Sequence, residues 1–186
     1  MFSAFRKALR EPRFLGAMIL LAVSLLAGCA AEMATHTSLN RGLLGQENIQ
    51  KVAVLAFESP MDDLQAGVHI SSLFENYLIQ SGIYQIAERG SVERIFKDQA
   101  LLKPPELDLS TLYQIKEDLG IDGIILGSVS QYNRANLGFT ARLVSTRSGI
   151  VLWSISQTGG RVARPLSQVA DETVQAAVKD LQSKVR

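Results

Sequence analysis

The sequence has 186 residues, a formal net charge of +1 and a single cysteine, Cys29. The nearly balanced charge gives no support for nucleic-acid binding, and a single cysteine excludes an internal disulfide and a thiolate metal cluster. Hydrophobic residues make up 47% of the chain, which is enough for a sizeable core that must hold without covalent cross-links.

The first 28 residues have the pattern of a secretory signal peptide. An apolar run over residues 14–27 is about 14 residues long, short of the ~20 that a membrane-spanning helix needs. The basic residues that precede it are Arg6, Lys7, Arg10 and Arg13. We therefore predict that residues 1–28 are cleaved, leaving 158 residues with a formal charge of −2.

Leu26, Ala27, Gly28 and Cys29 close this run, and the quartet resembles the bacterial lipobox. The resemblance implies that the Cys29 thiol carries acyl chains such as palmitate and that Cys29 is the first residue of the mature protein. Ala30 follows where an aspartate would oppose sorting to the outer membrane. We therefore expect a lipid-anchored outer-membrane protein that faces the periplasm. The alternative is an ordinary signal peptide from which Cys29 is discarded.

Residues 29–48 are small and polar and lack sustained apolar periodicity. They predict a lipidated flexible tether with a root-mean-square reach of roughly 25 Å and at most ~65 Å when stretched. Residues 49–186 form a single predicted domain, which this tether keeps near its membrane.

The domain begins with an unbroken apolar run over residues 49–57, which predicts a strand covered on both faces. Apolar residues at helical spacing predict a helix over 66–80, ended by Gly82. A short strand over 84–87 then precedes a helix that Ser91 is expected to cap.

Ser110 is expected to cap the next helix, and a strand over 121–132 follows it. Alternating residues in 139–144 and 151–155, around a Ser-Gly turn, predict a β-hairpin. Pro165 opens a final amphipathic helix. The predicted fold is α/β, with a mixed five-stranded sheet packed by about four helices in the order βαβααβββα.

Motifs for nucleotide binding, serine hydrolysis and zinc catalysis are absent from the sequence. The residues considered for chemistry are His36, His69, Asp62, Asp63, Ser128 and Ser130. Neither histidine has a second ligand at helical spacing, the adjacent aspartates favour a turn, and the serines have no positioned base. We therefore predict no catalytic, metal or cofactor site, and no bound cofactor.

Several short motifs follow one another along the chain. The first is Tyr84, Gln85, Ile86, Ala87, Glu88, Arg89, with Val92, Ile95, Asp98, Gln99 and Leu101 behind it. The second motif consists of residues 119–122, Ile125 and residues 127–129. The third consists of residues 142–144, Thr146, Gly149 and residues 151–153. In this order they are similar to the CsgG-type family of curli-secretion lipoproteins, and the likeness spans roughly residues 50–160. It implies an α/β domain shared with the amino-terminal domain of TolB and the LpoB activators of penicillin-binding proteins, and non-catalytic work in envelope assembly.

The sequence departs from the pore-forming members of that family. These insert long membrane hairpins, whereas residues 132–139 are a short connection and 157–165 lead almost directly into the last helix. A transmembrane strand needs about 9 to 11 residues, so we expect no membrane hairpin. An LpoB-type reach across the cell wall needs a long linker, and the 19 residues 30–48 are too few.

The candidates for contact with a protein partner are Glu88, Arg89, Arg142 and Trp153. The alternatives are a local cap or ion pair for Glu88 and Arg89, and burial for Trp153. The arginines of the hairpin region are Arg134, Arg142, Arg147, Arg161 and Arg164. They either meet an acidic partner or cell-wall polymer, or protect a solvated sheet edge.

The expected function is that of a non-catalytic outer-membrane adaptor or assembly factor. It would bind the membrane through the lipid on Cys29, together with a periplasmic or outer-membrane protein. The alternatives are a homo-oligomeric component of a curli-type or flagellar secretion or appendage complex, and an activator of a peptidoglycan synthase.

Overall fold

The computed structural model describes residues 34–60, 63–98, 108–133, 136–160 and 164–185. In chain order the elements are β1 (Ala34–Leu39), α3 (Arg41–Gln46), β2 (Lys51–Val54), α4 (Ala66–Ser81), β3 (Gln85–Ile86), α5 (Arg89–Asp98), α6 (Leu109–Leu119), β4 (Gly123–Tyr132), β5 (Asn136–Ser145), β6 (Val151–Gly160) and α7 (Leu166–Val185). The strands form one sheet in the order β1-β6-β5-β4-β2-β3. Strand β2 is parallel to β3 and β4, and the other pairs are antiparallel.

The predicted α/β class is confirmed, but the count of five strands is wrong by one. The additional strand, β1, lies within the segment expected to be a flexible tether, and the short helix α3 follows it there. Its sequence is polar, so it has no apolar alternation to reveal it. It is a strand because all six of its residues pair with β6, from Ala34 opposite Thr158 to Leu39 opposite Trp153.

Two predicted helix caps are also wrong. Asp108, in extended conformation, caps α6: its carboxylate accepts the Thr111 amide at 2.7 Å. Ser110 is already the second residue of that helix. Helix α5 begins at Arg89, so Ser91 lies inside its first turn and donates its hydroxyl to Glu88. For α6, a second capping-type residue two positions before Ser110 takes the helix start.

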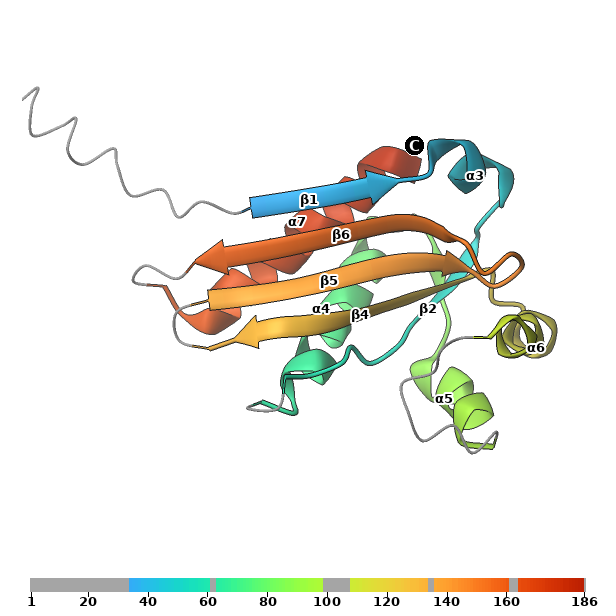
Figure 1. The fold of residues 1–186 in the computed structure, drawn as a ribbon, viewed down its shortest axis with the longest axis horizontal. Helices are drawn as coiled ribbons and strands as arrows, with labels where there is room; N and C mark the ends of the chain where they lie inside the picture. The colour runs from blue at the N-terminus through green and yellow to red at the C-terminus, as the bar shows by residue number, and fades with distance from the viewer. Residues whose placement is uncertain (1–33, 61–62, 99–107, 134–135, 161–163, 186) are drawn as a thin grey trace, which may run out of the picture. The chain divides into compact units, whose positions relative to one another are not determined.

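Helices α4 and α7 cover one face of the sheet, as Figure 1 shows. Their apolar sides enclose the main core with the inward residues of the strands. The largest fully buried side chains of this core are Trp153 and Phe139 from the strands and Phe74 from α4. The rings of Phe74 and Phe139 meet edge to face with centroids 5.7 Å apart. This packed layer gives the side chains on the opposite face of the sheet a rigid support.

The opposite face is only partly covered. Helices α5 and α6 pack over β2 and the beginning of β4, around a second core that includes Val92, Ile115, Ile121 and Ile124. The rest of this face, over β1, β6, β5 and the second half of β4, is left open by the described helices (Figure 1). Antiparallel sheets commonly leave one face to solvent, and this is the antiparallel part of the sheet.

Candidate interaction surface

The open sheet face carries two rows of side chains that run across four strands. The strand pairings place His36, Ser156, Thr140 and Ser128 in one row. They place Ser38, Ser154, Arg142 and Leu126 in the next. Alternate residues of a strand point to the same face, so these rows are a direct consequence of the register. We call these eight residues the hydroxyl face, because five of them carry hydroxyl groups.

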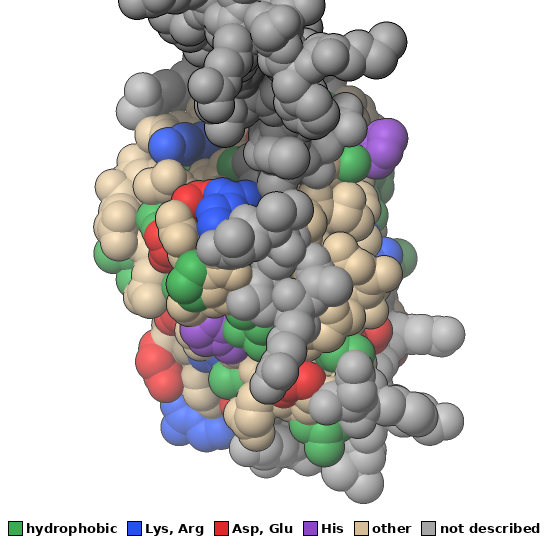
Figure 2. Space-filling view, turned by 90° about the vertical axis from the view of Figure 1, so that its left-hand side faces the viewer, with side chains coloured by type: hydrophobic (Ala, Val, Ile, Leu, Met, Phe, Trp, Pro, Cys, Tyr) green, Lys and Arg blue, Asp and Glu red, His purple; other side chains and the backbone are tan. Residues whose placement is uncertain are grey.

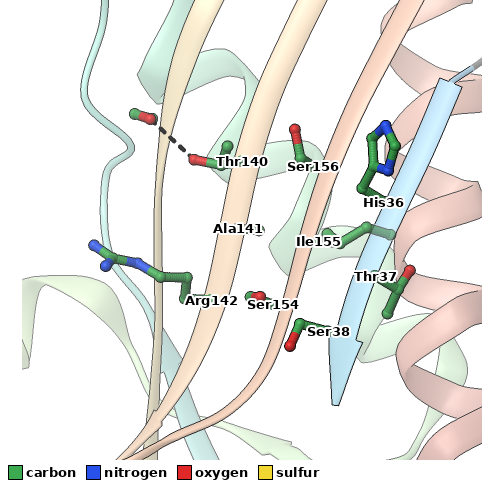
Figure 3. Close-up of a pocket in the computed structure, with 10 residues that line it drawn as sticks. His36, Thr37, Ser38, Thr140, Ala141, Arg142, Ser154, Ile155 and Ser156 are labelled. Atoms are coloured by element: carbon green, nitrogen blue, oxygen red, sulfur yellow. Dashed lines mark hydrogen bonds between the residues drawn. The ribbon is translucent and has the colours of Figure 1, made fainter.

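A groove of about 580 Å³ lies on the hydroxyl face. Figure 3 shows its lining, with His36 and Ser38 from β1, Ser154 and Ser156 from β6, and Thr140 and Arg142 from β5. Most of these side chains are small, so a ligand can approach the backbone of the sheet closely. The Ser128 and Thr140 hydroxyls hydrogen-bond each other at 3.0 Å, which fixes one side of the groove.

The groove is suited to polar contact. Its hydroxyls both donate and accept hydrogen bonds, the Arg142 guanidinium only donates, and His36 can do either. Its lining has no Asp or Glu, so a pair of carboxylates for general acid and base work is missing there. In the described parts of the chain, no group of three or more His, Cys, Asp or Glu is arranged to hold a metal ion.

Strand β1 forms one border of this surface and is the outer strand of the sheet. Its sequence, ATHTSL, contains no charged residue and no proline, and its pairing with β6 is uninterrupted over six residues. Natural edge strands are usually protected by lysine, proline or a bulge. Within the described residues the outer edge of β1 is unpaired and has none of these, so it is open to pairing with another strand.

Two of the predicted contact residues have structural partners within the chain. Arg89 donates its Nε to the Val54 carbonyl at 3.0 Å and a terminal nitrogen to Glu75 at 3.0 Å, with only 16% of its side chain exposed. Glu88 is exposed and accepts the Ser91 hydroxyl at 2.7 Å, which lowers the pKa of the Glu88 carboxyl. This geometry matches the alternative of a local cap and ion pair, although the ion pair is with Glu75.

The other two predicted contact residues lie in different layers. Trp153 is fully buried under α7, and its indole N–H donates to Asp180 at 3.0 Å, so it serves the core. Arg142 is exposed and lines the groove. As a partner contact it stays a prediction, as does the lipidation of Cys29: residues 26–29 lie outside the described part of the chain.

The residues considered for chemistry are dispersed. His36 and Ser128 belong to the hydroxyl face, while His69 is on α4, where its ring packs against Tyr132 with centroids 6.0 Å apart. Asp63 accepts the Gln65 amide in the turn before α4. Asp62 lies outside the described residues. The signal for the hydroxyl face was present in the small hydroxylated residues that alternate along β6, but the face is complete only with β1, which was not predicted.

The motif at residues 119–122 connects helix α6, which covers part of this face, to the sheet. Asp122 accepts the amides of Gln50 at 3.0 Å and Lys51 at 2.9 Å, and it also binds the Lys116 ammonium. Lys51 in turn donates its ammonium to the Leu119 carbonyl at 2.8 Å. This group of contacts joins α6, β2 and the start of β4, and we call it the Asp122 clasp.

Burial and hydrogen bonds act in opposite directions on the Asp122 carboxyl. Burial raises its pKa, whereas the hydrogen bonds from Lys116 and from the Lys51 and Gln50 amides lower it, and the resulting pKa lies below its ordinary value. The clasp is therefore held by a carboxylate that stays ionised.

Comparison with protein families gives a match over residues 50–139 to the model described as curli production assembly/transport component CsgG. The chain resembles the CsgG family. The resemblance predicted from short motifs is confirmed over this range, and the motif at 142–153 lies beyond it. No curated protein matches the chain in sequence.

Three solved structures share the fold. The PelC dodecamer from Paraburkholderia phytofirmans is 20% identical, with a TM-score of 0.57 over 81% of this chain and 98% of that one. Lipoprotein GNA1162 from Neisseria meningitidis is 20% identical, with a TM-score of 0.53 over 73% and 99% of the two chains. The hypothetical protein CT253 from Chlamydia trachomatis is 11% identical, with a TM-score of 0.53 over 73% and 98%. At these identities the likeness shows the fold alone.

None of the helices in the described residues is long and apolar enough to cross a membrane.

Proposed function

We propose that this CsgG-like chain is a non-catalytic envelope lipoprotein, anchored to the outer membrane through Cys29, that binds a protein partner on its hydroxyl face. The observation that carries the proposal is the open half of the sheet, where two rows of mostly polar side chains line a groove of about 580 Å³. The match to CsgG over residues 50–139 supports work in the envelope.

The chemistry of the groove favours a polar, non-covalent contact. Hydroxyls from four strands point outward on a support that α4 and α7 make rigid. Arg142 adds one positive charge, and an acidic group on the partner would neutralise it. His36 is the other titratable side chain of the lining, and no carboxylate there is placed to activate a nucleophile.

Site-specific photo-crosslinking in intact cells tests this proposal. A photoreactive amino acid at Ser38 or Arg142 samples the hydroxyl face, and the same residue at exposed Lys179 or Ser183 on α7 samples the opposite side. We expect one discrete adduct from the first two positions and not from the controls. Ser156→Arg should abolish that adduct by filling the groove, while Lys179→Glu should leave it unchanged. Adducts that are absent, or the same from both sides, would contradict an adaptor role of this face.

A second candidate function is that of a subunit in an oligomeric secretion or appendage complex. The free, uncharged edge of β1 favours it, and the similar fold of PelC is found in a dodecamer. Native mass spectrometry in mild detergent should then show a defined oligomer. Thr37→Lys, which adds a charge to the exposed edge strand, should reduce it to monomers. A monomer at all concentrations of the unaltered protein would remove this candidate.

A further inference from the structure

One end of the sheet brings together parts of the chain that are far apart in sequence. At this end Ala34 pairs with Thr158, Thr158 with Gly138, and Gly138 with Gln131. Neighbouring strands are about 4.8 Å apart, so this row carries the end of β4 to about 14 Å from the start of β1. Tyr132, the last residue of β4, therefore lies near the point where the chain enters the domain.

Exposed apolar side chains lie at the same end. The contact between the rings of His69 and Tyr132 places the start of α4 beside the end of β4. There Leu64 is 73% exposed and Val68 is 44% exposed. Figure 2 views the molecule from this end, where apolar side chains are visible among polar and charged ones. Of the apolar residues in the described chain, Leu64 is one of the least protected, and no role in the core accounts for it.

The length of the chain before β1 limits how far this end can be from Cys29. Four residues lie between Cys29 and Ala34, so the two Cα atoms are five steps apart, and at about 3.6 Å per step an extended chain spans at most roughly 18 Å. The opposite end of the sheet is a further ten-residue strand away, about 33 Å. It carries α6, because a Cβ built on Gly149 in the β5–β6 turn would meet the Leu109 side chain.

We propose that the sheet end formed by Ala34, Tyr132 and the start of α4 rests on the lipid surface, with Leu64 and Val68 as the side chains that enter it. The proposal relies on the lipid anchor at Cys29 put forward above. The contact we propose is apolar, because Leu64 and Val68 carry it and the charged groups that the structure describes beside them do not form a basic patch. Asp63 acts on Tyr132 by its negative charge, and the Arg164 guanidinium is paired with Glu172 at 2.6 Å.

The orientation can be measured with one environment-sensitive fluorophore on the lipidated full-length protein in phosphatidylcholine vesicles. Cys29 is the only native cysteine and its thiol is blocked by the acyl chain, so Leu64→Cys introduces the one reactive thiol. Val68→Cys provides a second position at the same end. Tyr113→Cys on α6 is the matched control, because Tyr113 is 61% exposed at the other end of the sheet.

Quenching by nitroxide-labelled lipids should be several-fold stronger at positions 64 and 68 than at position 113. Vesicles with added phosphatidylglycerol should give the same order. The intact mass first shows whether the protein carries its acyl chains. If it does, equal quenching at the two ends, or stronger quenching at position 113, overturns the proposed orientation but does not contradict the anchor. A mass without acyl chains, or vesicle binding that Cys29→Ser does not abolish, overturns the proposed anchor.

Discussion

Replacement of Asp122 by alanine should lower the free energy of unfolding by about 3 kcal/mol. The substitution removes a carboxylate that accepts two backbone amides and the Lys116 ammonium. A hydrogen bond to a charged group contributes about 1.5–3 kcal/mol, and water replaces part of this because the Gln50 amide is exposed. The side chains of Asp122 and Lys116 are 16% and 27% exposed, so screening by solvent is incomplete. Roughly half of the gross contribution of three such bonds gives the stated figure.

Urea unfolding followed by circular dichroism measures this loss. With a slope of about 2 kcal/mol per molar urea, the midpoint should fall by about 1.5 M. Asp118→Ala is the matched control, because Asp118 is an exposed carboxylate on the same helix that accepts a hydrogen bond from the Gln114 side-chain amide. It should change stability by less than about 0.5 kcal/mol.

The dependence on pH provides an independent check on Asp122. Its pKa is lowered by folding, so the unfolded chain takes up a proton first as the pH falls. The stabilisation is therefore complete above the ordinary aspartate pKa and is lost as the pH drops through the lower folded value. The difference between the unaltered protein and Asp122→Asn should shrink below about pH 4. A difference that is constant down to acid pH, or no larger than that of Asp118→Ala at neutral pH, would refute the clasp as a source of stability.

The remaining predictions use the same unfolding assay. Gly67→Ala should lower the free energy of unfolding by about 2–4 kcal/mol, because the added Cβ would lie 1.9 Å from the Phe57 carbonyl oxygen. Gly45→Ala in α3 is the control: its Cβ meets no atom within 4 Å, so it should raise the free energy of unfolding by up to about 1 kcal/mol. Trp153→Phe should cost about 2–3 kcal/mol through the lost volume and the lost bond to Asp180; an unchanged midpoint would place Trp153 outside the core. Arg89→Ala should cost about 2 kcal/mol, and a partner-dependent phenotype without any loss of stability would contradict its structural role.

The elements with a clear apolar period could be predicted from the sequence. Helices α4 and α7 were expected close to their observed bounds, because each places an apolar stripe against the sheet. The hairpin β5–β6 was expected from alternation on both sides of the turn at Gly149, which has a φ of +70°. In these cases local sequence and tertiary packing favour the same structure.

The elements that depend on distant partners could not be predicted. Strand β1 has no apolar alternation, and its conformation comes from pairing with β6, more than a hundred residues later in the chain. The candidate site shares this dependence, since His36 and Ser38 enter the groove only because β1 pairs there. Burial of Trp153 likewise depends on the docking of α7, so the residue type alone could not separate a core tryptophan from a contact residue.

Strand β1 also changes what the proposed anchor implies. A tether over 29–48 would let the domain turn freely within about 65 Å of the membrane. With β1 beginning at Ala34, four residues lie between the domain and Cys29, and that strand is the border of the groove. An anchor at Cys29 therefore holds the hydroxyl face close to the membrane surface, open to the side. A partner that reaches it must itself lie at or near the outer membrane, and this narrows the proposed adaptor to membrane-proximal partners.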